Sequence, residues 1–203
     1  MKNLNVIDNL RPLPINFYYQ PTLDLARSLL GCILLKDSPE GIAAGIIVET
    51  EAYIGPGDMA AHSFQNRRTK RTEVMFGLPG YTYTYSMHTH CLFNVVSGNV
   101  NEPEAVLIRG IEPFYNEDLI ASRRDNVKKS KDWTNGPGKL TKALGITMND
   151  YGHLLTKKPL WIAEKRSSNF KIEAGPRIGI ENSGEAKNYP WRFWISDNKF
   201  ISR

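Results

Sequence analysis

The pattern of apolar and polar positions predicts a mixed protein in which strands outnumber helices. Residues 22–30 carry apolar side chains at helical spacing, and Gly31 supplies the stop signal, so a short helix is expected there. Two aliphatic segments, 32–36 and 45–53, flank the turn-rich stretch DSPEG. Short apolar runs separated by turn residues predict an antiparallel hairpin.

The clearest strand pattern lies in residues 81–96, where tyrosine and threonine alternate in YTYTY before a second apolar run. This period of two predicts a long hairpin with a polar tip at 86–90. Residues 104–113 have the pattern of a buried strand, and 159–164 and 192–196 predict two late strands.

Helices are expected at 115–124 and 135–146, but strands and helices do not alternate regularly. A doubly wound parallel sheet is therefore disfavoured. The expected fold is α/β of the α+β type, with a mostly antiparallel sheet. No repeat or Ser/Gly linker divides the chain, so residues 1–203 are expected to form a single domain, in which 1–20 are an irregular lead-in.

Composition narrows the class of protein. The chain has 203 residues, of which 41% are hydrophobic, which is enough to build a sizeable core. It has no apolar run of 18 residues and no apolar leader, so we expect a cytoplasmic protein that does not enter the membrane, associated with the nucleoid if bacterial. Lys and Arg number 26 against 21 Asp and Glu, an excess of five that only hints at a polyanionic partner.

Two carboxylates lie two positions apart in the predicted strand VETEAY. Glu49 and Glu51 should therefore leave the same face of the strand, and Tyr53 should follow them. Two interpretations remain open on the residues alone. Both acids could be solvated on an edge strand, or one could be a general base beside an orienting acid in a dry site.

Several other polar residues stand in unusual surroundings. Asn94 and Arg109 are embedded in apolar strands, where buried polar groups need partners. A loop histidine such as His62 is more often solvated than catalytic. His88 and His90 form an HxH pair, but no third ligand is evident nearby, so neither a metal nor another cofactor is expected.

Basic residues concentrate at 67–71, 123–131 and 139–142. Each cluster alone is typical of a solvated face. Together they flank aromatic residues, the carboxylate strand and a Gly-rich helix start, which favours contacts with a phosphodiester backbone. An enzyme acting on nucleic acid is the reasonable hypothesis.

The motifs, taken in order, resemble the alkyladenine (3-methyladenine) DNA glycosylases. The resemblance rests on LARSLLG, IIVETEAYIGPGDMAAHS, RTKRTEVMFGLPGYTYTY, FNVV, AVLIRGIEP, NGPGKLTKALGI and GPRIGI, which run from about Pro21 to the last strands. It implies a curved antiparallel sheet flanked by helices, with a protruding β-hairpin that inserts into the DNA minor groove.

The resemblance also implies roles for individual residues. Glu51 matches the general base that activates water against C1′ of a flipped nucleotide. Arg109 matches a residue that positions this water and a nearby phosphate, and the carbonyl of Ile178 matches a further water ligand. No nucleophilic lysine belongs to the matched site, so a monofunctional enzyme that leaves an abasic site is implied.

A second group of matched residues would hold the flipped base. Tyr53, His62 and Tyr85 match the residues that sandwich the base, and Asn94 matches the group that discriminates against the guanine amino group. Stacking platforms suit a flat, electron-poor alkylated base.

A third group would contact DNA. Thr69, Arg71 and Lys139 match phosphate-contact regions more loosely. At the hairpin tip this sequence has SMHTH where the family commonly has an aromatic residue and glycine, so Met87 or His88 is the candidate wedge.

The expected activity is thus base-excision repair of damaged purines in double-stranded DNA. The expected lesions are 3-methyladenine and hypoxanthine, with ethenoadenine as a further candidate, and the enzyme is expected to be a monomer. The alternatives are a non-catalytic damaged-DNA-binding protein on the same fold and a formyl-transfer or RNA-binding module that uses a related sheet.

Overall fold

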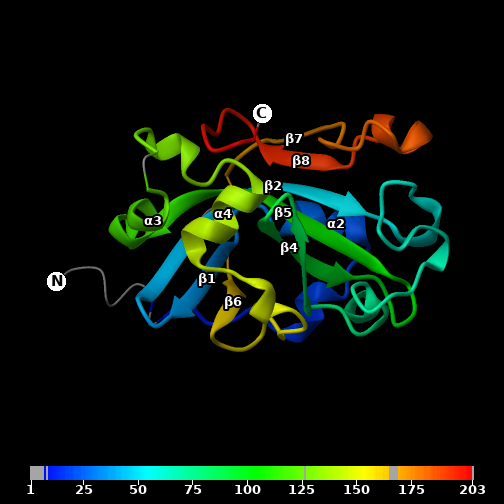
Figure 1. The fold of residues 1–203 in the computed structure, drawn as a ribbon, viewed down its shortest axis with the longest axis horizontal. Helices are drawn as coiled ribbons and strands as arrows, with labels where there is room; N and C mark the ends of the chain where they lie inside the picture. Colours follow the sequence, from blue (N-terminus) through cyan, green and yellow to red (C-terminus); the bar gives the residue numbers. More distant parts are fainter. Residues whose placement is uncertain (1–6, 8, 126, 165–168, 203) are drawn as a thin grey trace.

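The computed structural model describes residues 7, 9–125, 127–164 and 169–202. One curled sheet dominates it, and every strand pair in the sheet is antiparallel (Figure 1). The strands are β1 (Ile33–Ser38), β2 (Gly41–Tyr53), β3 (Thr82–Met87), β4 (His90–Ser97), β5 (Glu104–Tyr115), β6 (Leu160–Ala163), β7 (Ile172–Gly175) and β8 (Arg192–Ile195). The main path runs β3-β4-β5-β2-β1-β6, while β8 pairs with β2 and β7 pairs with β8. The α+β fold expected from the sequence is confirmed.

Among the described residues, three α-helices accompany the sheet: α2 (Thr22–Ser28), α3 (Glu117–Arg123) and α4 (Pro137–Leu144). Short 3-10 turns complete the elements: η1 (Ile15–Tyr18), η2 (Gly55–Gly57), η3 (Phe64–Asn66), η4 (Glu73–Phe76), η5 (Ser130–Asp132), η6 (Met148–Asp150) and η7 (Gly184–Asn188). All three helices fall inside the segments predicted from the sequence. Strand β7 was not predicted, because its short IEAG segment is largely exposed and lacks an apolar run.

Strand β2 is central to the sheet, and on one of its two sides the neighbouring strand changes along its length. It pairs with β5 on one side from Ala44 to Tyr53. On the other side its first half pairs with β1, as in Ile33 with Ile46, and its second half pairs with β8, as in Glu49 with Trp194. The register against β5 shifts on both sides of Glu49. Such bulges bend a strand and increase its twist, which curls the sheet where the second half of β2 begins.

The main core lies between the sheet and its helices. Helix α2 packs on β2 and β5, while α4 packs on β4 and β5. Leu25, Phe93, Leu140 and Phe193 are completely buried in this layer. Burying each such side chain contributes about 1.5–3 kcal/mol, so this layer is the main source of stability. None of the described helices is long and apolar enough to cross a membrane.

The described part of the lead-in is more ordered than the sequence suggests. Pro12 forms a bridge with Ala163, and Leu13 and Tyr18 are buried. The Trp161 indole donates a hydrogen bond to the carbonyl of Leu10. These contacts tie the lead-in to β6; its residues 1–6 and 8 lie outside the described part of the chain.

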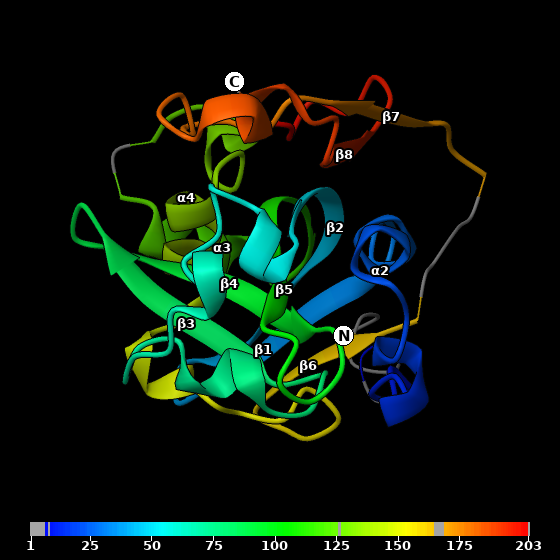
Figure 2. The same ribbon diagram turned by 90° about the vertical axis from the view of Figure 1, so that its right-hand side faces the viewer.

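Strands β3 and β4 form the hairpin predicted from the alternating pattern. Its tip lies at the edge of the molecule, on the left in Figure 2. Met87 pairs with His90, and the two residues between them, His88 and Thr89, have φ values of 47° and 71°. A two-residue loop with both φ values positive matches a type I′ turn, which suits the twist of a hairpin. Insertion of this tip into DNA remains a prediction.

Candidate active site

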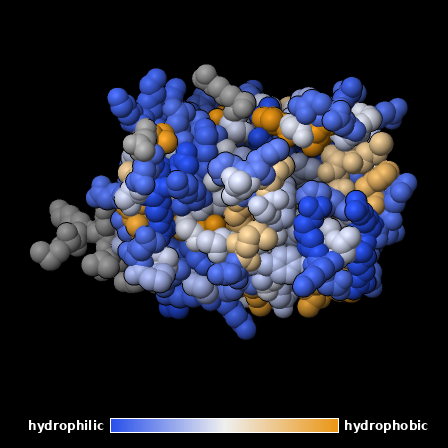
Figure 3. Space-filling model, in the orientation of Figure 1, coloured by the Kyte–Doolittle hydropathy of each residue, from blue (hydrophilic) through white to orange (hydrophobic). Residues whose placement is uncertain are grey.

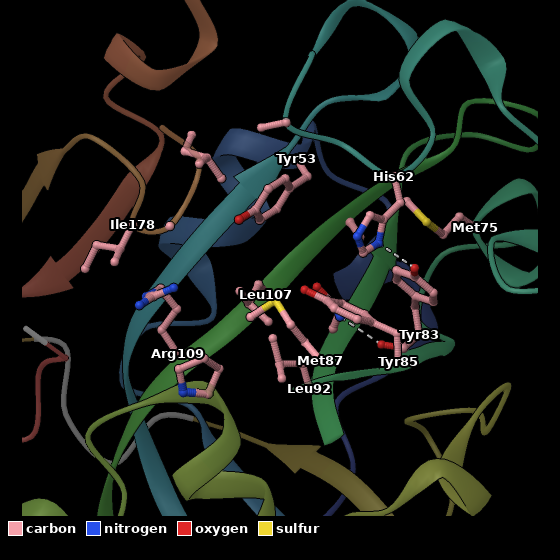
Figure 4. Close-up of a pocket in the computed structure, with 16 residues that line it drawn as sticks. Tyr53, His62, Met75, Tyr83, Tyr85, Met87, Leu92, Leu107, Arg109 and Ile178 are labelled. Atoms are coloured by element: carbon pink, nitrogen blue, oxygen red, sulfur yellow. Dashed lines mark hydrogen bonds between the residues drawn. The ribbon is translucent and has the colours of Figure 1, made fainter. Parts of the chain in front are cut away.

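A pocket of about 160 Å³ opens on one face of the curled sheet (Figure 4). Strand register explains its walls. Glu51 pairs with Leu107, Leu107 pairs with Asn94, and Asn94 pairs with Tyr83, so these side chains share one face of four adjacent strands. The residues that line the pocket are Tyr53, Ala60, His62, Met75, Tyr83, Tyr85, Met87, Leu92, Asn94, Ala105, Leu107, Arg109, Pro137, Ile178, Gly179 and Ile180.

The carboxylate of Glu51 is completely buried and contacts three donor groups. Its Oε2 accepts a 2.8 Å hydrogen bond from the Tyr53 hydroxyl and lies 3.3 Å from Nη1 of Arg109. Its Oε1 accepts a 2.8 Å hydrogen bond from the amide of Ile178. Burial raises the pKa of the Glu51 carboxyl, while Arg109, the Ile178 amide and Tyr53 oppose that rise. A buried carboxyl with a raised pKa and fixed partners is typical of an acid-base site.

Glu49 is also completely buried, so the solvated edge-strand interpretation of the two acids is wrong. Its Oε1 accepts from Arg192 at 3.1 Å and from the Ser202 hydroxyl at 2.8 Å, and its Oε2 accepts from the Ser202 amide at 2.6 Å. Arg109 joins the two acids, since its Nε donates to Glu49 at 3.3 Å and its Nη1 faces Glu51. Glu49 therefore orients Arg109 against Glu51.

The bulge between β2 and β5 places Arg109 in this position. Gly110 pairs with Glu49 and Ile108 pairs with Thr50, so Arg109 has no partner directly opposite. Bulges redirect side chains and are frequent beside active sites. The irregularity brings the guanidinium between the two carboxylates.

Aromatic side chains form the opposite wall. The rings of His62 and Tyr85 meet edge to face, with centroids 4.6 Å apart, and Tyr83 stacks on Tyr85 at 5.4 Å. His62 Nδ1 lies 2.7 Å from the Tyr83 hydroxyl. Burial, followed by the charges of Arg71 and Arg67, lowers the pKa of His62 to about 4. The imidazole is therefore neutral at physiological pH.

The amide of Asn94 closes the floor of the pocket. Asn94 is buried, and its Nδ2 donates a 2.9 Å hydrogen bond to the carbonyl of Tyr83. This bond fixes the side chain between the strands while it lines the cavity. The amide of Ile178 contacts Glu51, and the role of its carbonyl as a water ligand stays a prediction.

Of the predicted DNA contacts, only Met87 lines the pocket. Arg71 is exposed, but its charge acts on His62, and Met87 is 47% exposed at the pocket rim. The amide of Thr69 donates to the Thr72 hydroxyl. Lys139 is half-buried and donates to Asn135 at 2.7 Å.

Lys139 also belongs to a second, polar cleft of about 350 Å³. This cleft is lined by Lys129, Lys131, Asp132, Asn135, Lys139, Lys199 and Ile201. The cleft brings together lysines of two basic clusters, 123–131 and 139–142, for which the sequence predicted phosphate contacts. Lys199, which follows β8, is added to them. His88, at the hairpin tip, is exposed, and the described residues contain no group of three or more side chains suited to hold a metal.

Some site residues were not predicted. Tyr83 carried a usable signal, because it lies two positions before Tyr85 and therefore on the same face. Met75, Arg177 and Ser202 carried none, since long-range packing alone brings them to the site.

The fold and the site together define an enzyme whose narrow pocket has aromatic walls and a buried carboxylate at one side. Such a pocket can hold a planar group and activate a water molecule against a bond beside the ring. Its surroundings are rich in exposed lysine and arginine.

Comparison with known proteins identifies the family. Residues 16–199 match the family described as methylpurine-DNA glycosylase (MPG). A protein of Bacillus licheniformis is 64% identical over 95% of this chain and 97% of its own length, and one of Bacillus subtilis is 59% identical over the same shares. A Listeria monocytogenes protein is 47% identical over 92% of this chain and 89% of its own length. All three bear the name "Putative 3-methyladenine DNA glycosylase".

The chain belongs to the methylpurine-DNA glycosylase family. It is therefore a hydrolase of N-glycosyl bonds, a DNA glycosylase for alkylated bases in base-excision repair.

Proposed function

We propose that this enzyme flips 3-methyladenine and hypoxanthine out of duplex DNA into the aromatic pocket and cleaves the N-glycosidic bond with water activated by Glu51. Ethenoadenine is a further proposed substrate. The observation that carries the proposal is the buried Glu51 carboxylate, held by Arg109, Tyr53 and the Ile178 amide beside a pocket walled by aromatic rings.

The proposed chemistry follows from the leaving group. 3-Methyladenine is cationic in DNA and leaves with little help from an acid, so its excision mainly needs a base for water and support for an oxocarbenium-like sugar. Hypoxanthine and ethenoadenine are neutral, so each must take up a proton from solvent as it leaves. Glu51 supplies the base, and Arg109 positions water near a phosphate. The carbonyl of Ile178 is proposed as a further ligand of this water.

Pocket composition supports a monofunctional reaction. No lysine is among the residues that line the pocket in the described part of the chain, so no amine is placed to form a Schiff base. The proposed products are a free base and an intact strand carrying an abasic site.

The walls suggest how the flipped base is held. We place it between Tyr53 on one side and His62 with Tyr85 on the other, next to the amide of Asn94. A neutral His62 suits a cationic base, because a protonated imidazole would repel it. The hydrogen bond from Asn94 Nδ2 to the carbonyl of Tyr83 holds the side chain in place, and we propose that the fixed amide opposes the guanine amino group.

The remaining contacts concern DNA. Met87 or His88 is proposed to fill the stack that the flipped base leaves, and Thr69, Arg71 and Lys139 are proposed to contact phosphates. We further propose that the enzyme works as a monomer, in the cytoplasm beside the nucleoid.

The decisive experiment replaces Glu51. Glu51→Gln keeps the size of the side chain but removes the base, so release of 3-methyladenine or hypoxanthine from defined duplexes should fall at least about 100-fold. Binding of the lesion duplex should persist. Glu40→Gln, at an exposed position, is the matched control and should retain full release.

Unaltered release by Glu51→Gln would overturn the assignment of the base. If the unmodified protein bound lesion duplexes but released no base, the alternative of a non-catalytic damage-binding protein would take the place of this proposal.

The wedge requires a separate comparison. Met87→Ala and His88→Ala should be measured for affinity toward a lesion duplex and an undamaged one. Loss of the preference for the lesion in one variant identifies the wedge. If neither variant weakens binding, the tip does not insert.

A further inference from the structure

A buried ion pair contacts Tyr53, which lines the pocket. The Arg177 guanidinium donates to Asp58 through both terminal nitrogens, with Nη1 2.5 Å from Oδ2 and Nη2 2.8 Å from Oδ1. Both side chains are completely buried. A two-pronged pair of this kind fixes angles as well as distance.

Arg177 connects the pair to two parts of the site. Its Cζ lies 4.6 Å from the centre of the Tyr53 ring, and its Nη1 donates to the carbonyl of Ala52 at 2.8 Å. The next residue in the chain is Ile178, whose amide donates to Glu51. A shift of the Arg177 backbone would therefore displace the donor to Glu51.

Asp58 connects the pair to a third part. Its Oδ2 accepts from the amide of Ile54 at 3.2 Å, and its Oδ1 accepts from the amide of Ala60 at 3.0 Å. These bonds close the loop that leads from β2 to His62. The Asp58 carboxylate thus binds the loop amides and the Arg177 guanidinium at the same time.

The cost of this arrangement argues for a specific role. The buried Nε of Arg177 has no hydrogen-bond partner among the described residues. Burying charges is expensive, and apolar side chains of similar volume often stabilise a core equally well. An ion pair that holds three separate parts of one pocket provides geometry that apolar packing would not.

We propose that Asp58 and Arg177 are a positioning pair that fixes the Tyr53 ring, the Ile178 amide and the His62 loop in the geometry needed for excision. This inference rests on the proposed function. Neither residue lines the pocket, so the pair acts through its neighbours. The substituted proteins should bind DNA but align Glu51 and the base poorly.

The test compares single-turnover excision by Arg177→Met, Asp58→Asn and Arg177→Lys. The first two should excise about 100-fold more slowly, since a misplacement of about 1 Å has such an effect on rate. Arg177→Lys keeps the charge but not the two-pronged contact, so it should recover stability and remain slow. If Arg177→Met does not fold, the other two variants carry the comparison.

The pH profile supplies a readout that a purely structural role would not change. The groups that act on Glu51 are Arg109 on β5, Glu49 and Tyr53 on β2, Tyr85 on β3 and the Ile178 amide. Loss of the aligned amide removes one stabiliser of the carboxylate. The acid limb of the excision rate should therefore move up by about one pH unit in Arg177→Met and Asp58→Asn.

Lys36→Met is the matched control. Lys36 and Asp150 form another buried ion pair, whose side chains are 11% and 8% exposed and which does not line the pocket. This control should lower the melting temperature without changing the rate or the pH profile. If the Asp58 and Arg177 variants behave as the control does, the inference is overturned. If the unmodified protein releases no base, it is the proposed function that fails.

Discussion

At the scale of single residues, Tyr53 links the two tasks of the pocket. Its hydroxyl donates a hydrogen bond to Glu51, and its ring lines the pocket. The guanidinium of Arg177 packs over one face of the same ring. A buried carboxylate needs such donors, because burial alone favours its neutral form. The same side chain thus lines the pocket and favours the ionised form of the proposed base.

Tyr53→Phe tests this link. Loss of the hydroxyl removes a donor to the ionised carboxylate, so the pKa of Glu51 should rise further and the acid limb of excision should move up by about one pH unit. The rate is compared between pH 4 and 9 under single-turnover conditions. Tyr81→Phe, outside the pocket, should leave the profile unchanged. A Tyr53→Phe profile that overlays the original would contradict the proposed link.

His62 makes the stability of the fold depend on pH. Its pKa is lowered from 6.5 to about 4, so between these values the unfolded chain binds more protons than the folded one. Stability should fall as pH drops from 6.5 toward 4, by at most about 1.4 kcal/mol per pH unit, and by less because the ring is partly exposed. Urea unfolding at several pH values measures this slope. His62→Asn should flatten it; an unchanged slope would show that His62 is not responsible.

Sequence reasoning at this scale reached the residues whose local surroundings are unusual. Glu51 and Arg109 stood out as charges in apolar strands, and the structure brings them together. Ser202 and Arg177 could not be found this way, because they reach the site through contacts with residues more than 100 positions earlier. A polar residue in an unremarkable stretch of sequence gives no sign of a long-range partner, which only the folded structure shows.

At the scale of elements, period and turn signals predicted β1 to β6, β8 and the three α-helices. The bulge that places Arg109 between Glu49 and Glu51 could not be predicted. The register between β2 and β5 depends on the whole length of both strands and on the pairing of β2 with β8. The division of β2 between β1 and β8 is likewise a property of the assembled sheet. The shape of the site therefore came from strand pairing, whereas part of its composition, such as Glu51 and Arg109, was visible in the sequence.

The hairpin tip offers a prediction about an element. Thr89 is β-branched and has a φ of 71°, a conformation that costs such a residue about 1–2 kcal/mol. Thr89→Gly should relieve this strain and raise the free energy of unfolding by about 0.5–1 kcal/mol, measured by chemical denaturation. Ser86→Gly, within β3, should instead lower it. Equal effects at both positions would show that the backbone of Thr89 is not strained.

At the scale of the whole molecule, the structure shows where the excess basic side chains lie. The acids of the site are matched internally by Arg109, Arg177 and Arg192. Other lysines gather in the cleft that includes Lys139 and Lys199. Hydrophilic side chains cover most of the face shown in Figure 3. The net charge of +5 thus leaves basic groups available for a polyanion.

Salt dependence tests this distribution. Each lysine that contacts a phosphate adds about 0.9 to the slope of log affinity against log salt concentration. Lys139→Ala and Lys199→Ala should each reduce that slope by about this amount, while Lys187→Ala, outside the cleft, should not. Excision at saturating enzyme should be insensitive to all three. A slope that stays constant in the cleft variants would exclude the cleft from the DNA interface.

The network around the two strand carboxylates has a consequence for synthesis. Glu49, Glu51 and Asp58 leave the ribosome well before Arg177, Ile178, Arg192 and Ser202, which supply most of their donors. Until these later residues emerge, a nascent chain holds three acids that it cannot bury at low cost. The sheet can begin to assemble on the ribosome, but the catalytic geometry is completed only when the last segment docks across β2. A chain that lacked residues 177–202 would therefore lack the donors to these three acids that Arg177, Ile178, Arg192 and Ser202 supply.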